Sequence, residues 1–144
     1  MLASKLLLHL LNEIGEAVKG KTMFQKIVFI LSSEFPEAHG LSDLSYTKYY
    51  YGPFSRKLES ILEDAELRGF VQVTPRPVGD VVRYDISIAE EGKKALRSDT
   101  LSLEEATLIK RMAQRTKHLN SLSLDEVISE AYRTAGRQVV SRSS

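Results

Sequence analysis

The sequence contains no cysteine, and its three histidines (His9, His39 and His118) are far apart. The lack of cysteine excludes a disulfide framework, a zinc site built on thiolates and a cysteine nucleophile. Histidines that bind metals usually occur as closely spaced pairs, so we expect no metal and no other cofactor. A chain without cysteine fits a reducing compartment, and we predict a cytoplasmic protein.

Long hydrophobic runs are also missing. No apolar stretch approaches the ~20 residues that cross a bilayer, so we expect no membrane association. Lysine and arginine (20) nearly balance aspartate and glutamate (19), and the net charge of +1 indicates no particular partner. The length of 144 residues predicts a single domain over residues 1–135, followed by a flexible tail over residues 136–144.

Apolar periodicity predicts two helices near the N-terminus. In residues 2–18 the apolar side chains lie on one side, with Lys5 and His9 on the other, and Gly20 is positioned to end the helix. Thr22 is placed to cap a second helix, which spells MFQKIVFILSSEF and is apolar around most of its circumference. We therefore predict that this second helix lies at the centre of the core.

A strand, a helix and a hairpin are predicted next. The segment Tyr46–Tyr51 is rich in residues that favour strands, and we expect Gly52–Pro53 to end it. The helix Arg56–Arg68 follows, with Ser55 as its cap and Gly69 as its stop. Two alternating runs, FVQVT and VVRYDISI, flank a turn and predict a β-hairpin. Further helices are predicted over AEEGKKALRS, residues 101–119 and residues 123–134.

The order of these elements predicts an α+β fold that is mainly helical. Three helices, a strand and a hairpin that can pair with it are the makeup of a winged helix-turn-helix domain. We therefore predict a three-stranded antiparallel sheet, with extra helices at the N- and C-terminal ends. In such a domain the helix before the hairpin would enter a DNA groove, and the hairpin tip would lie beside it.

Several short motifs resemble those of one family. The stretch YYYGPFSRKLESILEDAELRGFV is similar to a segment of the YwgA-like proteins and of the related SocA-type antitoxin family called Panacea. The matching residues are Tyr51, Gly52, Pro53, Phe54, Ser55, Leu62, Gly69 and Phe70, with the upstream pair Gln25 and Lys26 and the later Tyr132. The hairpin and the helix after it also resemble the wing of many winged-helix regulators. The resemblance implies a protein that is not an enzyme: a DNA-binding regulator, or an antitoxin or adaptor that binds another protein.

Ser55 is a candidate nucleophile because it follows a predicted Gly-Pro turn. A serine nucleophile needs a base within hydrogen-bond reach, and the sequence gives no reason to bring a histidine there. The segment GPFS also lacks the pattern of a nucleophile elbow, and no phosphate-binding glycine motif is present. We interpret Ser55 as a helix cap, and we predict no catalytic residue.

DNA binding is the first functional hypothesis. The expected contacts are Ser55, Arg56, Lys57 and Ser60 at the start of the helix, with Arg76 and Arg83 on the hairpin. A helix N-terminus that carries two cations is a suitable phosphate contact. Four acidic residues farther along the same helix oppose deep insertion into a groove. Under this hypothesis the protein is a transcriptional regulator that binds double-stranded DNA.

The alternative hypothesis is a protein-interaction module of antitoxin or adaptor type. Its partner would be a protein such as a toxin or the target of a protease adaptor. Glu63 and Leu67 on the outer face of the helix Arg56–Arg68 are candidate contacts, as are Arg111 and Arg115 on one face of a later helix. A homodimer through the first or last helices is a further expectation, because winged-helix regulators commonly read paired half-sites.

Overall fold

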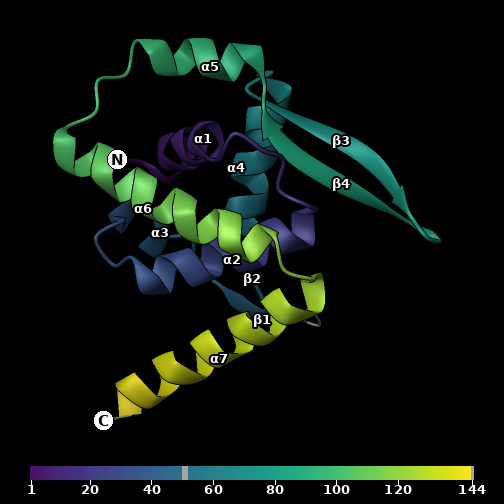
Figure 1. Cartoon of the computed structure of the whole chain (residues 1–144). Helices are drawn as coiled ribbons and strands as arrows, with labels where there is room; N and C mark the ends of the chain where they lie inside the picture. Colours follow the sequence, from purple (N-terminus) through teal and green to yellow (C-terminus); the bar gives the residue numbers. More distant parts are fainter. Residues whose placement is uncertain (50–51, 144) are drawn as a thin grey trace.

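The computed structural model describes residues 1–49 and 52–143, and Figure 1 shows how the elements are arranged. The helices are α1 (Ala3–Ile14), α2 (Lys21–Glu34), α3 (His39–Ser42), α4 (Arg56–Leu67), α5 (Glu90–Arg97), α6 (Leu103–Asn120) and α7 (Leu124–Ser143). The strands are β1 (Thr47–Tyr49), β2 (Gly52–Phe54), β3 (Val71–Val78) and β4 (Val81–Ile88). The predicted class, α+β and mainly helical, is confirmed.

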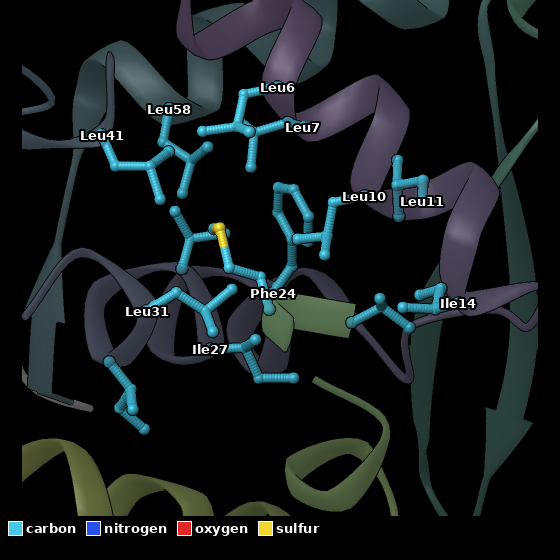
Figure 2. Packing of buried hydrophobic residues seen from close by; sticks show 14 of the residues in the cluster. Leu6, Leu7, Leu10, Leu11, Ile14, Phe24, Ile27, Leu31, Leu41 and Leu58 are labelled. Carbon is cyan, nitrogen blue, oxygen red and sulfur yellow. The ribbon is translucent and has the colours of Figure 1, made fainter. Parts of the chain in front are cut away.

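Helix α2 lies at the centre of the core, as its apolar circumference predicts. Phe24, Ile27 and Leu31 are all at most 3% exposed, and the leucines of α1 pack onto them (Figure 2). Leu41 of α3 and Leu58 of α4 belong to the same cluster, and α6 and α7 pack on other sides of α2. Each such side chain contributes roughly 1.5–3 kcal/mol by leaving water, so this cluster dominates the stability.

Two glycines shape the connection between α1 and α2. Gly15 has φ 65°, in the left-handed region, and it ends α1 earlier than the predicted stop at Gly20. Gly20 is instead the N-cap of α2, and its carbonyl accepts a hydrogen bond from the Phe24 amide. Thr22 lies inside α2, so the prediction that it caps the helix was wrong. The early stop leaves Val18 free to adopt an extended conformation.

The predicted three-stranded sheet was wrong, because the structure contains two separate two-stranded sheets in its described part. Strand β1 pairs with β2 directly after it, in a register that sets Thr47 opposite Phe54 and Lys48 opposite Pro53. The predicted stop at Gly52–Pro53 is therefore part of a strand. Proline is tolerated there because each strand of a two-stranded sheet has a free edge, where no amide is needed. Tyr50 and Tyr51 lie outside the described residues.

Strands β3 and β4 form the predicted hairpin, in register from Val71 opposite Ile88 to Val78 opposite Val81. Its inner half is partly buried against the helices, with Val71 and Ile86 in the core, whereas its outer half projects away from them (Figure 1). One antiparallel bridge joins Val18 to the edge of β4. The Val18 amide donates to the Ile86 carbonyl at 2.8 Å, and the Ile86 amide donates to the Val18 carbonyl at 3.0 Å.

The C-terminal helices follow their predicted positions, with one extension. Ser102 and Glu105 form a capping box at the start of α6, which satisfies backbone amides that no helical carbonyl reaches. Helix α7 continues through Gly136 as far as Ser143, so most of the predicted tail is helical. A single glycine costs a helix only about 1 kcal/mol, and no proline follows to stop it. Over residues 1–49 and 52–143, no helix is both long and apolar enough to cross a membrane.

Candidate functional site

Ser55 is the N-cap of α4, as predicted. Its hydroxyl accepts a hydrogen bond from the Leu58 amide at 3.1 Å and donates one to the carbonyl of Leu44. The residue is fully buried, so its side chain lies out of reach of a partner. This burial removes Ser55 from the set of DNA contacts that we predicted, and it leaves the hydroxyl with a structural role.

Gln25 and Lys26 hold the segment that precedes α4. The Gln25 amide accepts from the Ser55 backbone N–H at 2.9 Å and donates to the Ser55 carbonyl at 2.9 Å. The Lys26 ammonium donates to the Pro53 carbonyl at 3.0 Å. Burial of Lys26 lowers its pKa from 10.5 to about 8. Within the described residues no carboxylate forms an ion pair with it, so folding buries a cation with only one carbonyl partner.

The motifs of the family resemblance therefore meet in space. A Cβ placed on Gly52 would lie 3.5 Å from Cε of Lys26 and 3.9 Å from Cζ of Tyr132. Three segments that are far apart in the sequence thus surround Gly52 closely. Sequence reasoning did not assign a role to Gln25 or Lys26. The signal was available, because a glutamine and a lysine inside an apolar helix must find polar partners when buried.

The exposed start of α4 carries the remaining predicted DNA contacts of that helix. Arg56, Lys57 and Ser60 are exposed, and they line a groove of about 900 Å³ whose other wall is formed by residues 1–4, 39–40 and 43–44. The Lys57 ammonium donates to the carbonyl of Asp43 at 3.1 Å. These side chains could reach a phosphate backbone, since none of them is buried.

The rest of α4 is acidic. Its outer side carries Glu59, Glu63, Asp64 and Glu66, all exposed. Two cations, Arg56 and Lys57, against four carboxylates leave residues 56–67 with a net charge of −2. Such a helix repels the phosphates of a groove over most of its length.

The two predicted hairpin arginines share one carboxylate. Arg76 and Arg83 face each other across the strands, and Asp85 lies beside them, only 4% exposed. Arg83 donates to both Asp85 oxygens at 2.7 and 3.0 Å, and Arg76 lies 3.2 Å from one of them. The hydrogen bonds that Arg83 donates to the Asp85 carboxylate raise the pKa of Arg83 above its usual range. With Asp80 in the turn, two positive and two negative charges cancel along residues 71–88.

The outer half of the hairpin is apolar. Val78, Val81, Val82 and Tyr84 are 46%, 64%, 52% and 46% exposed, and the exposed prolines of β3 lie among them. Val78 and Val81 share one face of the hairpin, and Val82 and Tyr84 share the other. Apolar side chains that gather in this way on an exposed projection are typical of interaction surfaces. Sequence reasoning predicted the hairpin but assigned no role to these apolar residues. The signal was the pair of apolar stretches on both sides of the turn.

The predicted partner contacts lie in different environments. Leu67 is 87% exposed, and Glu63 is exposed on the same helix. Arg115 is engaged inside the molecule, because it donates to both carboxylate oxygens of Glu34 at 2.8–3.2 Å and so ties α6 to α2. The Arg111 guanidinium lies over the Phe35 ring at 5.3 Å. Glu63, Leu67 and Arg111 are therefore exposed to a partner, whereas Arg115 is held within the fold.

His9 makes a structural contact with Asp99. His9 was predicted on the polar side of its helix, yet it is buried, with Nε2 at 2.7 Å from Oδ2 of Asp99. The connection between α5 and α6 covers that side of α1. Hydrogen bonds from His9 and then from Lys5 lower the pKa of Asp99. Among the residues that the structure describes, no group of histidine and acidic side chains could hold a metal ion.

No protein family, curated protein or solved structure matches the chain. The resemblance to the YwgA-like and Panacea proteins therefore stays a prediction. The function must therefore be inferred from the exposed residues of α4 and of the β3–β4 hairpin.

Proposed function

We propose that this protein is a non-enzymatic protein-interaction module and that the outer half of its β3–β4 hairpin is the main contact surface. The exposure of Val78, Val81, Val82 and Tyr84 carries the proposal. About half of each side chain is still exposed, so burying the rest in an interface yields on the order of 1 kcal/mol each. An antitoxin or adaptor, as the family resemblance implies, binds its partner through a surface of this kind.

A winged-helix-like arrangement is part of the proposal. The order α1, Val18, α2, α4 and the β3–β4 hairpin matches helix, short strand, two helices and wing, with the Val18–Ile86 bridge in place of a full third strand. Helix α3 and the β1–β2 hairpin are then an insertion between the second and third helices. In this arrangement the hairpin is the wing, and its tip is apolar instead of basic.

DNA binding is the second candidate function. It is favoured by Arg56, Lys57 and Ser60, which line one groove at the start of α4. Charge opposes it, since α4 is acidic overall and the hairpin charges cancel. The apolar hairpin tip would also contribute little to phosphate binding. We therefore rank protein interaction first.

Affinity purification after crosslinking in the source cells tests this ranking. Wild-type protein should capture one partner in near-stoichiometric amount, and Val81→Asp should reduce capture about tenfold or more, as expected for a charge placed in an apolar interface. Leu103→Asp is the matched control, because Leu103 is also an exposed apolar residue (84%, against 64% for Val81) and begins α6, outside the hairpin. Leu67→Asp tests the competing surface on α4.

Capture that is insensitive to Val81→Asp would refute the hairpin surface. Duplex binding measured by fluorescence anisotropy addresses the second candidate. If the protein regulates DNA, its affinity should fall steeply with salt, and Arg56→Ala together with Lys57→Ala should flatten that dependence. Salt-sensitive duplex binding without any captured protein would reverse our ranking.

A further inference from the structure

The two edges of the β3–β4 hairpin differ. The Val18–Ile86 bridge uses the amide and carbonyl of Ile86, so these groups point away from β3. Alternate residues of a strand point their backbone groups to the same side, and Tyr84 and Val82 therefore present theirs to the same edge as Ile86. In the described part of the chain, no backbone group pairs with Val82 or Tyr84 on that edge. The edge of β4 is open just beyond the bridge.

The opposite edge is blocked. Pro75 and Pro77 lie opposite Tyr84 and Val82, at positions where the strand nitrogen faces outward from the hairpin. Proline has no N–H, so the outer edge of β3 cannot pair fully with another strand. Proteins protect exposed edges in this way against unwanted strand pairing. Protection of one edge, but not of the other, indicates that the β4 edge has a partner.

A groove runs beside the open edge. It has a volume of about 610 Å³ and lies between the hairpin, the start of α2 and the connection from α6 to α7. The hairpin supplies Val78 and Val81–Tyr84 to its lining. The Lys21 ammonium lies 5.4 Å above the Tyr84 ring. The groove thus follows the strand edge and offers apolar contacts along it.

The charge of this groove is of one sign. Lys19, Lys21 and Arg83 line it, and no aspartate or glutamate is among its described lining residues. Arg83 is already paired with Asp85, whereas the two lysines are exposed and form no ion pair within the described residues. Two unpaired cations beside an apolar strand edge complement an acidic segment.

We propose that the groove binds an extended segment of a partner protein, rich in acidic and apolar residues, which adds to the β4 edge as a further strand. Its backbone pairs with Val82 and Tyr84, its apolar side chains contact Val81 and Val82, and its carboxylates lie near Lys19 and Lys21. This inference rests on the proposed function, since it specifies how the hairpin surface holds a protein.

Selection from a displayed library of random linear peptides, with the full-length protein as bait, tests the proposal. Enriched peptides should alternate Asp or Glu with β-branched or aromatic residues. Their binding should slow hydrogen–deuterium exchange at the Val82 and Tyr84 amides, which is the direct signature of strand addition. Val82→Pro removes the outward N–H and should weaken binding about tenfold, whereas Val82→Thr, which keeps the N–H, should change it less than about threefold.

Circular dichroism would reveal whether Val82→Pro disturbs the hairpin. A variant that changes only the charge of the groove tests the proposal without altering the strand. Lys19→Glu should weaken the acidic peptides about tenfold, and Lys110→Glu, on the exposed side of α6, should have little effect. Failure to enrich any peptide, enrichment of basic peptides, or peptide binding by the Val82→Pro and Lys19→Glu variants that is as tight as that of the wild type would overturn the proposal. A homodimer that Val82→Pro dissociates in sedimentation would also overturn it, because a second copy would then occupy the edge.

The two proposals can fail separately. If Val81→Asp abolishes capture of the cellular partner but Val82→Pro does not, the hairpin binds a protein through side chains alone. In that case the proposed function stands and strand addition falls. If neither variant affects capture, both proposals fall.

Discussion

Replacing Lys26 with methionine should remove a pH dependence of stability from this protein. Lys26 is 2% exposed, and its pKa falls from 10.5 to about 8 on folding. At neutral pH the side chain is charged in both the folded and the unfolded chain, so the folded state carries the cost of burying a cation. Between pH 8 and 10.5 the unfolded chain binds more protons than the folded one, and the free energy of unfolding therefore rises with pH.

The size of the rise follows from these two pKa values. For a single site, the free energy of unfolding gains about 2 kcal/mol between about pH 7 and about pH 9.5. Lys26 also lines a cavity of about 200 Å³ that can admit water, and water screens the charge. We therefore expect about half of that value, on the order of 1 kcal/mol.

Urea unfolding at the two pH values measures this difference. The wild type should gain about 1 kcal/mol from Lys26 on going to about pH 9.5, and Lys26→Met should lack that gain. Methionine also leaves the Pro53 carbonyl without its donor, which costs about 1 kcal/mol, but this cost is the same at both pH values and cancels in the comparison. Lys110→Met, an exposed control, should retain the gain of the wild type. An equal rise in Lys26→Met and in the wild type would refute the reasoning.

Two further predictions concern stability. Ser55→Ala should lower the free energy of unfolding by about 1–3 kcal/mol, because it removes the cap of α4 and the donor to the Leu44 carbonyl, whereas Ser60→Ala, exposed on the same helix, should change it by less than about 0.5 kcal/mol. Equal effects of the two changes in urea unfolding would contradict the buried cap. Gly92→Ala should cost about 1–3 kcal/mol, since its Cβ would collide with the Phe70 carbonyl, while Gly136→Ala, in open space on α7, should stabilise by about 0.5–1 kcal/mol. Thermal melting should separate this pair, and a stable Gly92→Ala protein would show that the backbone there yields.

Local sequence signals predicted most elements correctly. The helix predicted over Arg56–Arg68 is α4, and its Ser55 cap and the outward position of Leu67 are confirmed. The turn between two alternating runs likewise indicated the β3–β4 hairpin. These features depend on side-chain periodicity and on backbone preferences at single residues, and both act within a few residues of the chain.

The errors arose where distant segments compete. Pro53 looked like the end of a strand, yet β1 turns back at once and pairs with the residues around it. His9 looked exposed, because sequence does not reveal that the segment around Asp99 covers it. Among the candidate contacts, Arg83 and Arg115 looked free, but Asp85 and Glu34 engage them. Sequence shows which residues carry charge, but not which charges neutralise each other.

The sequence alone establishes a mainly helical α+β chain, an apolar second helix at its centre, a serine cap and a hairpin that carries Arg76 and Arg83. Each of these follows from local periodicity or from residue type. Tertiary structure alone decides that Gln25 and Lys26 hold the segment before α4, that Asp85 neutralises the hairpin arginines, and that the edge of β4 stays open beside Lys19 and Lys21. These features depend on contacts between residues that are far apart in the sequence. A buried polar group must have a polar partner, and only the packing of the core decides which residue that partner is.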